Sequence, residues 1–219
     1  MCWNKDISLN TFVFSIFVLI FVIYNNKYTI YKDDFFNNKW AYLFLLSFIL
    51  MQLVEYFIWK NIDNKSVNHF FSTIGVLLLY SQPIFALMLL KNKSLRMKML
   101  FAYLIPATIY LIYLIKTTYF ITVVARNGHL KWNWEGRKLI TTVKIVFLFF
   151  LFFAFIYEKE YFYAFLGFIL IVISIIFYQK ENTATSMWCW SVNLIMLYLA
   201  FKYLFILPYK EHGFCSYHK

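Results

Sequence analysis

Long, uninterrupted apolar runs dominate this sequence and limit what it can fold into. A bilayer core of about 30 Å is crossed by roughly 20 residues of α-helix. Seven runs reach or approach that length: Ile7–Asn26, Trp40–Trp59, Val67–Leu90, Met97–Ile115, Leu139–Tyr157, Tyr161–Gln179 and Thr185–Leu207. The runs are continuous and exceed the about 9–11 residues of a membrane β-strand. They predict an all-α, polytopic integral membrane protein, a seven-transmembrane-helix bundle that forms a single domain over residues 1–219.

The composition agrees with this fold class and excludes several others. Hydrophobic residues make up 63% of the chain and charged residues only 14%, against about 25% charged residues in an ordinary soluble domain. So few charges exclude a soluble enzyme and a disordered chain. The three cysteines, at positions 2, 189 and 215, show neither a CxxC pair nor zinc-ligand spacing. We therefore expect no disulfide framework, no metal and no cofactor.

The formal net charge of +11 indicates membrane contact rather than nucleic-acid binding. The cations stand in short connections between the apolar runs, where they meet anionic headgroups and bias topology. No basic stretch is long enough to follow a phosphate backbone. Lys and Arg divide almost evenly between the two sides, and the dense loop from Lys91 to Lys98 favours an outside N-terminus and a cytoplasmic C-terminus. The first run exceeds a signal-peptide core, so we expect it to be retained.

Glu55 is the most informative residue, because an acid inside an apolar run is costly and usually faces a cavity or a partner. Gln52 and Trp59 share its helical face by three- and four-residue spacing. A rise of about 1.5 Å per residue puts Glu55 roughly 22 Å from Trp40, in the half of the bilayer nearer the N-terminus. In the alternative interpretation, Glu55 extends to water from the outer turn or is simply protonated.

Polar side chains from other runs fall at the same height as Glu55. They include Asn10 of the first run, Ser72 of the third, and Trp190 and Asn193 of the seventh. This common layer predicts a polar cavity among runs one, two, three and seven that binds a cation or a small polar solute. The alternative is a set of structural hydrogen bonds between helices, each contributing about 0.6–2 kcal/mol. Runs five and six are almost purely apolar, and we expect them to lie outermost.

Two further residue patterns bear on mechanism. Gln82-Pro83 lies in the third run, where proline removes a backbone hydrogen bond and kinks the helix. Such a kink beside a glutamine suits a gate, although proline kinks also occur in membrane helices without a functional role. Lys202, late in the seventh run, invites comparison with retinal-binding proteins. The third run carries no acid to serve as its counterion, so we expect Lys202 to extend to the headgroups.

The longest connection, Arg126–Lys138, supports the second functional hypothesis. Asn127-Gly128 is typical of a turn, and the alternating Leu130, Trp132 and Trp134 predict a short strand or interfacial segment. Such a loop could bind a partner, which would make the chain a non-catalytic scaffold or receptor. No GxSxG, HExxH or GxGxxG motif is present. We therefore expect no enzyme activity, with a lipid-modifying enzyme that uses Glu55 and His129 as a remote alternative.

Four segments together resemble an uncharacterised family of small polytopic membrane proteins of large DNA viruses and protists. They are residues 1–12 (MCWNKDISLNTF), Met51–Trp59, Gln82-Pro83 and Met187–Trp190. The resemblance covers most of the chain and implies a viral multi-pass membrane protein with no assigned activity. The run count is also similar to that of small sugar transporters and the PQ-loop family. Here the motif order is reversed and no second copy appears.

From these patterns we expect a small transporter or channel-like protein for a cation or small polar solute. The expected binding residues are Glu55, Gln52, Asn10, Asn193, Trp190 and Ser72, and the expected gating or kink residues are Gln82 and Pro83. The sequence does not define the oligomeric state.

Overall fold

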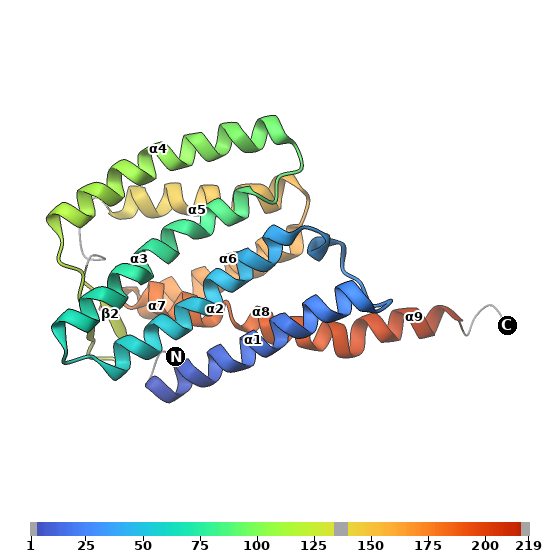
Figure 1. Ribbon diagram of the computed structural model, residues 1–219, viewed down its shortest axis with the longest axis horizontal. Coiled ribbons are helices and arrows are strands. Elements are labelled where there is room, and N and C mark those ends of the chain that lie inside the picture. The colour runs from blue at the N-terminus through green and yellow to red at the C-terminus, as the bar shows by residue number, and fades with distance from the viewer. Residues whose placement is uncertain (1–3, 134–139, 216–219) are drawn as a thin grey trace.

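The computed structural model describes residues 4–133 and 140–215, with side chains given over 4–133 and 142–211. It is built from helices that run back and forth along one axis (Figure 1). The long helices are α1 (Lys5–Tyr28), α2 (Lys39–Lys60), α3 (Lys65–Leu87), α4 (Lys93–Thr117), α5 (Ile140–Tyr157) and α6 (Tyr161–Tyr178). The last rod consists of α7 (Ala184–Ser191), α8 (Leu194–Phe201), the π-helical η3 (Lys202–Ile206) and α9 (Leu207–Cys215). Short 3₁₀ turns, η1 (Asp34–Asn37) and η2 (Gln179–Glu181), and strands β1 (Thr122–Val124) and β2 (Leu130–Trp132) complete the fold.

The predicted all-helical class is confirmed, and six helical segments are long and apolar enough to cross a membrane. They correspond to the first four predicted runs and the last two. The fifth run differs, because its apolar helix within the described residues, Thr142–Tyr157, is shorter. Leu139, where that run was predicted to begin, and Trp134 lie outside the described residues.

Asparagine side chains fix where the first four long helices begin. In each case the side-chain oxygen of the N-cap residue accepts a hydrogen bond from a backbone amide in the first turn, which satisfies one of the unpaired donors there. The caps are Asn4 for α1, Asn38 for α2, Asn64 for α3 and Asn92 for α4. The polar residues at the ends of the apolar runs thus set the helix limits directly.

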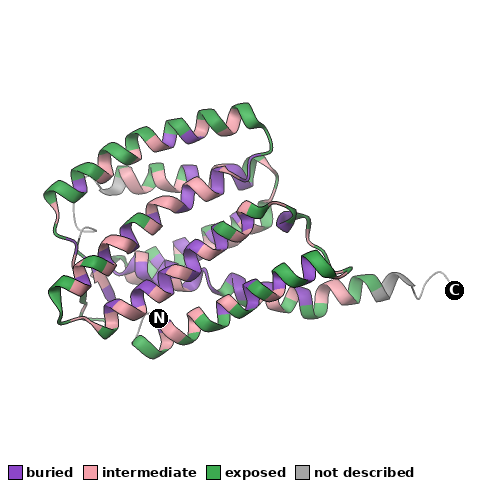
Figure 2. Cartoon of the chain, in the orientation of Figure 1, coloured by how far each residue is buried: buried purple, intermediate pink, exposed green. Residues whose placement is uncertain are grey.

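Helix α2 lies between α1 and α3 and is the most buried of the long helices (Figures 1 and 2). Helix α3 also packs on α5, while α6 packs on α7. The expectation that runs five and six both lie outermost is therefore wrong for run five. Its Phe150, Leu151, Ala154 and Phe155 are buried, since one face of α5 meets α3. Helix α4 takes a peripheral place instead, with mostly exposed or half-buried residues (Figure 2).

The connection between α4 and α5 forms an antiparallel hairpin in which Thr122 pairs with Trp132. The predicted strand at residues 130–132 is confirmed, and Gly128 adopts a positive φ of 76° in the turn. This hairpin enters the bundle rather than lying over it, because Leu130 and Trp132 are fully buried. The Trp132 ring packs on Gly75 of α3, where an added Cβ would overlap the ring.

An asparagine of α3 holds the hairpin in place. The Asn68 amide donates to the carbonyl of Thr122 at 2.8 Å, and its oxygen accepts from the amide of the same residue at 3.0 Å. One side chain thereby satisfies both backbone groups of a strand residue, as a neighbouring strand would. We call this side of the molecule the hairpin end. The α1–α2 connection lies at the opposite end (Figure 1), which we call the Lys202 end because Lys202 pairs with Asp33 of that connection.

The close packing of Trp132 on Gly75 generates a test of the inserted hairpin. Gly75→Ala places a methyl group inside the ring contact and should destabilise the fold by about 1–3 kcal/mol. Because the penalty comes from the ring, the same substitution in a Trp132→Leu background should cost much less. Thermal unfolding of the four proteins in detergent measures this coupling.

Gly167→Ala serves as the control, because its Cβ would stand 3.0 Å from Phe152, a milder contact. It should cost less than Gly75→Ala. If the losses of unfolding free energy from Gly75→Ala and Trp132→Leu were strictly additive, the Trp132 ring would not lie against Gly75.

Candidate functional site

The carboxyl group of Glu55 lies inside the bundle, between α2 and α7. Glu55, Gln52 and Ser186 are all 0% exposed. The Ser186 hydroxyl donates to Oε1 at 2.8 Å, and the Gln52 amide lies 3.5 Å from Oε2. The interpretation in which Glu55 extends to water is therefore wrong. The predicted association of Glu55 with Gln52 is present, and Ser186 is a partner that the sequence did not single out.

A second polar contact joins α1 to the interruption between α7 and α8. The Ser15 hydroxyl donates to the Asn193 oxygen at 2.8 Å, and the Asn193 amide donates to the Cys189 carbonyl at 2.9 Å. Asn193 lies in the break between α7 and α8, so its side chain satisfies a carbonyl near the end of α7. Seven residues separate it from Ser186, which corresponds to about 10 Å along the axis. The polar layer thus continues from Glu55 toward the centre of the bundle.

Other predicted site residues lie elsewhere. Ser72 is buried, but its hydroxyl bonds to Asn68 and Thr122, so it belongs to the hairpin attachment. Asn10 is exposed, and its predicted place beside Glu55 is wrong. Five residues from Ser15, it points about 140° away around the helix, whereas Ser15 faces inward. Trp190 is half-buried in α7.

The predicted kink residues Gln82 and Pro83 are both buried in α3. Among the described residues, neither the oxygen nor the nitrogen of the Gln82 amide has a hydrogen-bond partner. Pro83 leaves the carbonyl of Leu79 without its usual helical donor. The carbonyl of the next residue, Tyr80, accepts from the Tyr103 hydroxyl at 2.8 Å.

Glu55 lines none of the three pockets that the structure describes. A pocket of about 100 Å³ is lined mainly by apolar groups, among them Leu79, Phe147 and Trp188. Another of about 210 Å³ lies between α3, α4 and α5 and is lined by Tyr80, Tyr103, Tyr110 and their neighbours. The sequence predicted an open cavity here, whereas the structure shows a closed cluster in which the polar side chains pack against one another.

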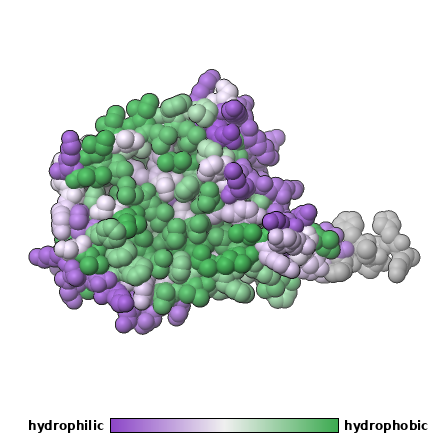
Figure 3. All heavy atoms as spheres, in the orientation of Figure 1, coloured by the Kyte–Doolittle hydropathy of each residue, from purple (hydrophilic) through white to green (hydrophobic). Residues whose placement is uncertain are grey.

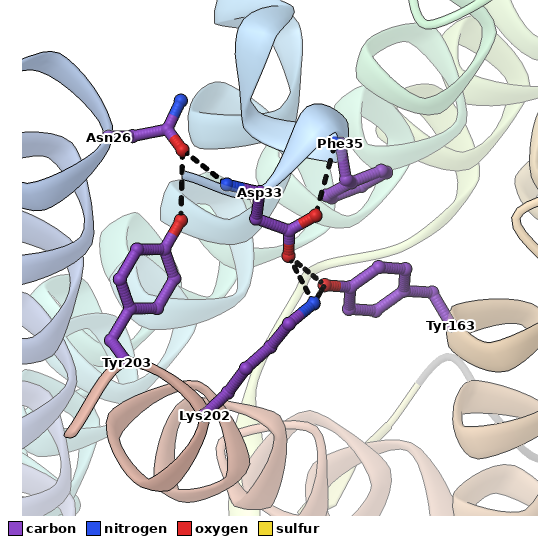
Figure 4. A network of polar contacts seen from close by, with 6 residues as sticks. All are labelled: Asn26, Asp33, Phe35, Tyr163, Lys202 and Tyr203. Atoms are coloured by element: carbon purple, nitrogen blue, oxygen red, sulfur yellow. Dashed lines mark hydrogen bonds and ion pairs between the residues drawn. The ribbon is translucent and has the colours of Figure 1, made fainter. Parts of the chain in front are cut away.

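A second polar network, at the Lys202 end, was missed by the sequence analysis (Figure 4). Lys202 forms an ion pair with Asp33 of the α1–α2 connection, and the Tyr163 hydroxyl donates to the same carboxylate at 2.8 Å. Asn26 accepts from the Tyr203 hydroxyl and from the Asp33 amide. The expectation that Lys202 extends to headgroups is wrong, since its side chain is only 19% exposed and is held by Asp33.

Local backbone geometry presents Lys202 and Tyr203 to this network. Both begin η3, a π-helical turn inside the last rod, and π-turns are frequent at functional sites. The only available sequence signal was the acid pair Asp33-Asp34 in a short connection, which does not reveal its partner 169 residues away. Asp33 also supplies the acid that the retinal comparison lacked. The adjoining pocket, lined by Phe35 and Tyr163, has only about 30 Å³, far below an ordinary small-molecule site.

Nearby charge and burial act on Glu160, which precedes α6. Burial raises the pKa of the Glu160 carboxyl above its ordinary value, and the Asp33 carboxylate raises it further. Lys91 and Lys202 lower the pKa in part. The Lys202 end therefore contains a carboxyl group whose protonation favours the folded arrangement.

An apolar layer separates the two networks. From Asn193 to Lys202 the last rod advances about 14 Å. Between them, Ile195, Met196 and Leu199 of α8 are buried, as are Val18 and Val22 of α1. The polar groups thus form two clusters rather than one continuous path.

Comparisons with protein-family models, with curated proteins and with solved structures found no match for this chain. The resemblance to a viral and protist family therefore stays a prediction. Among the described residues, no group of three or more His, Cys, Asp or Glu side chains could hold a metal ion.

The Asp33–Lys202 pair can be tested by removing one charge. Asp33→Asn leaves the Lys202 ammonium partly buried without its carboxylate and should destabilise the fold by about 1–3 kcal/mol. Asp34→Asn, at an exposed neighbour, should have little effect. Thermal unfolding measures both, and equal effects of the two substitutions would contradict the network.

The raised pKa of Glu160 predicts a pH dependence with a definite sign. Stability from the protonated carboxyl is fully present below the unfolded pKa of about 4.3 and is lost as pH rises through the raised folded value. The melting temperature of the wild type relative to Glu160→Gln should therefore fall between pH 4 and pH 7. Glu211→Gln, at an exposed residue of α9, should show the same pH dependence as the wild type. Parallel melting curves against pH for the wild type and Glu160→Gln would refute the raised pKa.

Proposed function

We propose that this chain is a multi-pass integral membrane protein with seven spans, of which α5 is the short one. Six helices have the required length and hydropathy. A broad hydrophobic surface lies between hydrophilic ends (Figure 3). Exposed apolar side chains of the long helices and of α8 include Phe17, Ile20, Phe101, Ile105, Ile109, Phe165, Phe168, Ile176 and Leu197. Soluble monomers rarely expose apolar patches of that extent.

The hairpin supports the inclusion of α5 among the spans. Gly75, which receives the Trp132 ring, lies ten residues into α3, or about 15 Å from its start. The Trp132 ring of the hairpin therefore reaches that depth in the bundle, and the described residues resume at Ile140 with the short helix α5. The dense cationic loop after α3 supports an outside N-terminus and a cytoplasmic C-terminus.

Within this membrane protein, we propose that Glu55 binds a cation or a small polar solute during transport. The observation that carries this proposal is a fully buried carboxyl group, hydrogen-bonded by Ser186 and close to Gln52. An ionisable group at such a position is costly in a bilayer and marks ion or proton pathways. The carboxylate form attracts cations, and its neutral form donates a hydrogen bond, so one side chain can take up and release a positive charge.

The interruption between α7 and α8 supports a transporter over a rigid scaffold. At Val192 and Asn193 the rod keeps a right-handed helical backbone, but its hydrogen bonds tighten to an i→i−3 pattern. A 3₁₀ stretch inside a helix often marks a functional hinge. Here the break contains Asn193, about two turns from the Glu55 contact. The scaffold alternative needs an exposed aromatic loop, yet Leu130 and Trp132 of that loop are buried.

Both ends of the cluster are closed in this conformation. At the hairpin end, Asn68 and Gly75 hold the hairpin, and at the Lys202 end the apolar layer and the Asp33 ion pair intervene. In this proposal the structure corresponds to an occluded state. Transport then requires the two closures to open in turn.

Flux in proteoliposomes tests the role of Glu55. We expect wild-type vesicles to conduct at least one of Na⁺, Rb⁺ or protons above empty vesicles, and Glu55→Gln to reduce that flux at least tenfold. The substitution keeps the shape of the side chain but removes its charge. Radiotracer uptake and an entrapped pH-sensitive dye provide the measurements.

Asp63→Asn, at an exposed acid beyond α2, is the matched control and should retain the wild-type flux. Circular dichroism and gel filtration establish that each variant is folded. Unchanged flux in folded Glu55→Gln, or no flux of any of the three ions in the wild type, would refute the role of Glu55 in cation transport.

A further inference from the structure

The amide of Gln82 is the least explained polar group in the interior. Its side chain is 0% exposed, and both its oxygen and its nitrogen are buried without a partner among the described residues. Leaving such groups unsatisfied costs about 1–3 kcal/mol each, and native proteins satisfy nearly all of them with protein atoms or ordered water. A buried amide whose oxygen and nitrogen both lack a hydrogen-bond partner therefore indicates that a ligand binds there.

Helix register places Gln82 on the same side of α3 as the Glu55 cluster. Gly75 lies against Val54, the neighbour of Glu55, with 3.3 Å between the site of a Gly75 Cβ and the Val54 side chain. Gln82 follows Gly75 by seven residues, which is two turns of the same face and about 10 Å deeper. Asn193 reaches a similar depth, seven residues beyond Ser186. Gln82 thus lies in the layer below Glu55, toward the bundle centre.

Gln52 lies between these two levels. It precedes Glu55 by one turn, about 4.5 Å deeper in the bundle, and its side-chain oxygen is also buried without a partner in the part of the chain that the structure describes. The carbonyl of Leu79 lacks a helical donor because Pro83 has no amide hydrogen. Its neighbours are satisfied: the Leu78 carbonyl accepts from Ser81, and the Tyr80 carbonyl accepts from Tyr103. Groups that lack a partner or their usual helical donor therefore occur at successive heights in the bundle, from Gln52 to the Pro83 kink.

The chemistry of these groups selects the ligand. Gln52 and Leu79 offer acceptors, while Gln82 offers both an acceptor and a donor. A bare metal cation would satisfy the oxygens and leave the Gln82 nitrogen unpaired. Water both donates and accepts, and a buried water typically makes about three hydrogen bonds to groups of this kind.

We infer that Gln82 and the Leu79 carbonyl bind water that extends the Glu55 site toward the centre of the bundle. The water site stands on the unsatisfied groups alone. Its role in transport rests on the proposed function: the water gives a proton at Glu55 a hydrogen-bonded continuation, so the transported cation is a proton.

Radiolytic hydroxyl-radical labelling tests the water site without reference to activity, because X-ray-generated radicals mark buried side chains beside bound water. In the full chain reconstituted in lipid, we expect labelling within residues 79–83 and a several-fold loss of that label in Gln82→Leu. Met196 of the apolar layer is the internal control, since it is more reactive chemically but is 2% exposed in apolar surroundings. No label at residues 79–83, or a label that persists in Gln82→Leu, would overturn the site.

Proton flux measured with an entrapped dye tests the relay. Gln82→Leu should reduce the flux at least tenfold. Ser81→Ala should leave it unchanged, because the Ser81 hydroxyl bonds to the carbonyl of Leu78 in its own helix. Gln82→Met, which keeps an unbranched chain of similar length, replaces the leucine variant if that protein does not fold.

The two experiments separate the possible failures. Loss of flux in Glu55→Gln with full flux in Gln82→Leu would overturn the relay and leave the role of Glu55 intact. Labelling at residues 79–83 without proton flux in the wild type would support the water site, overturn the relay, and identify the transport of protons as the failed step.

Discussion

The cost of taking a carboxyl group out of water governs this structure. Glu55 sits in the middle of apolar helices, and its charged or hydrogen-bonding form is tolerated there only with partners. Ser186 and Gln52 provide hydrogen-bonding groups around both carboxyl oxygens. Because Ser186 belongs to α7, the contact also fixes how the last rod lies against α2. The Glu55 carboxyl group, which is costly to remove from water, therefore also contributes to the packing of α7 against α2.

The surrounding structure encloses this group from both directions. Toward the hairpin end, a strand residue is bound by Asn68, and the absence of a side chain at Gly75 lets the Trp132 ring enter the bundle. Toward the Lys202 end, the last rod passes through an apolar layer before it reaches the ion pair with Asp33. The irregular points of that rod, the break at Asn193 and the π-turn at Lys202, coincide with the two polar networks.

The sequence predicted the features that depend on position along a helix. Apolar run length identified the helices, and a rise per residue gave the height of Glu55. That arithmetic does not give the direction of a side chain around the axis, which is why Asn10 was expected in the site although Ser15, in the same run, is the residue that faces inward. The Asp33–Lys202 pair was missed because its members are joined only by the folded arrangement of distant segments. The turn and the second strand of the hairpin were recognisable from Asn127-Gly128 and the alternation after it, but the first strand was not predicted. The close approach of the Trp132 ring depends on Gly75 in another helix.

A high-resolution cryo-electron microscopy structure of the protein in a lipid nanodisc tests the central claim most directly. The account predicts that the lipid belt surrounds the exposed faces of α1, α4 and α6. It also predicts that the Glu55 carboxyl points inward, within hydrogen-bond distance of the Ser186 hydroxyl. A structure in which Glu55 points toward the acyl chains, with Ser186 bonded elsewhere, would contradict it.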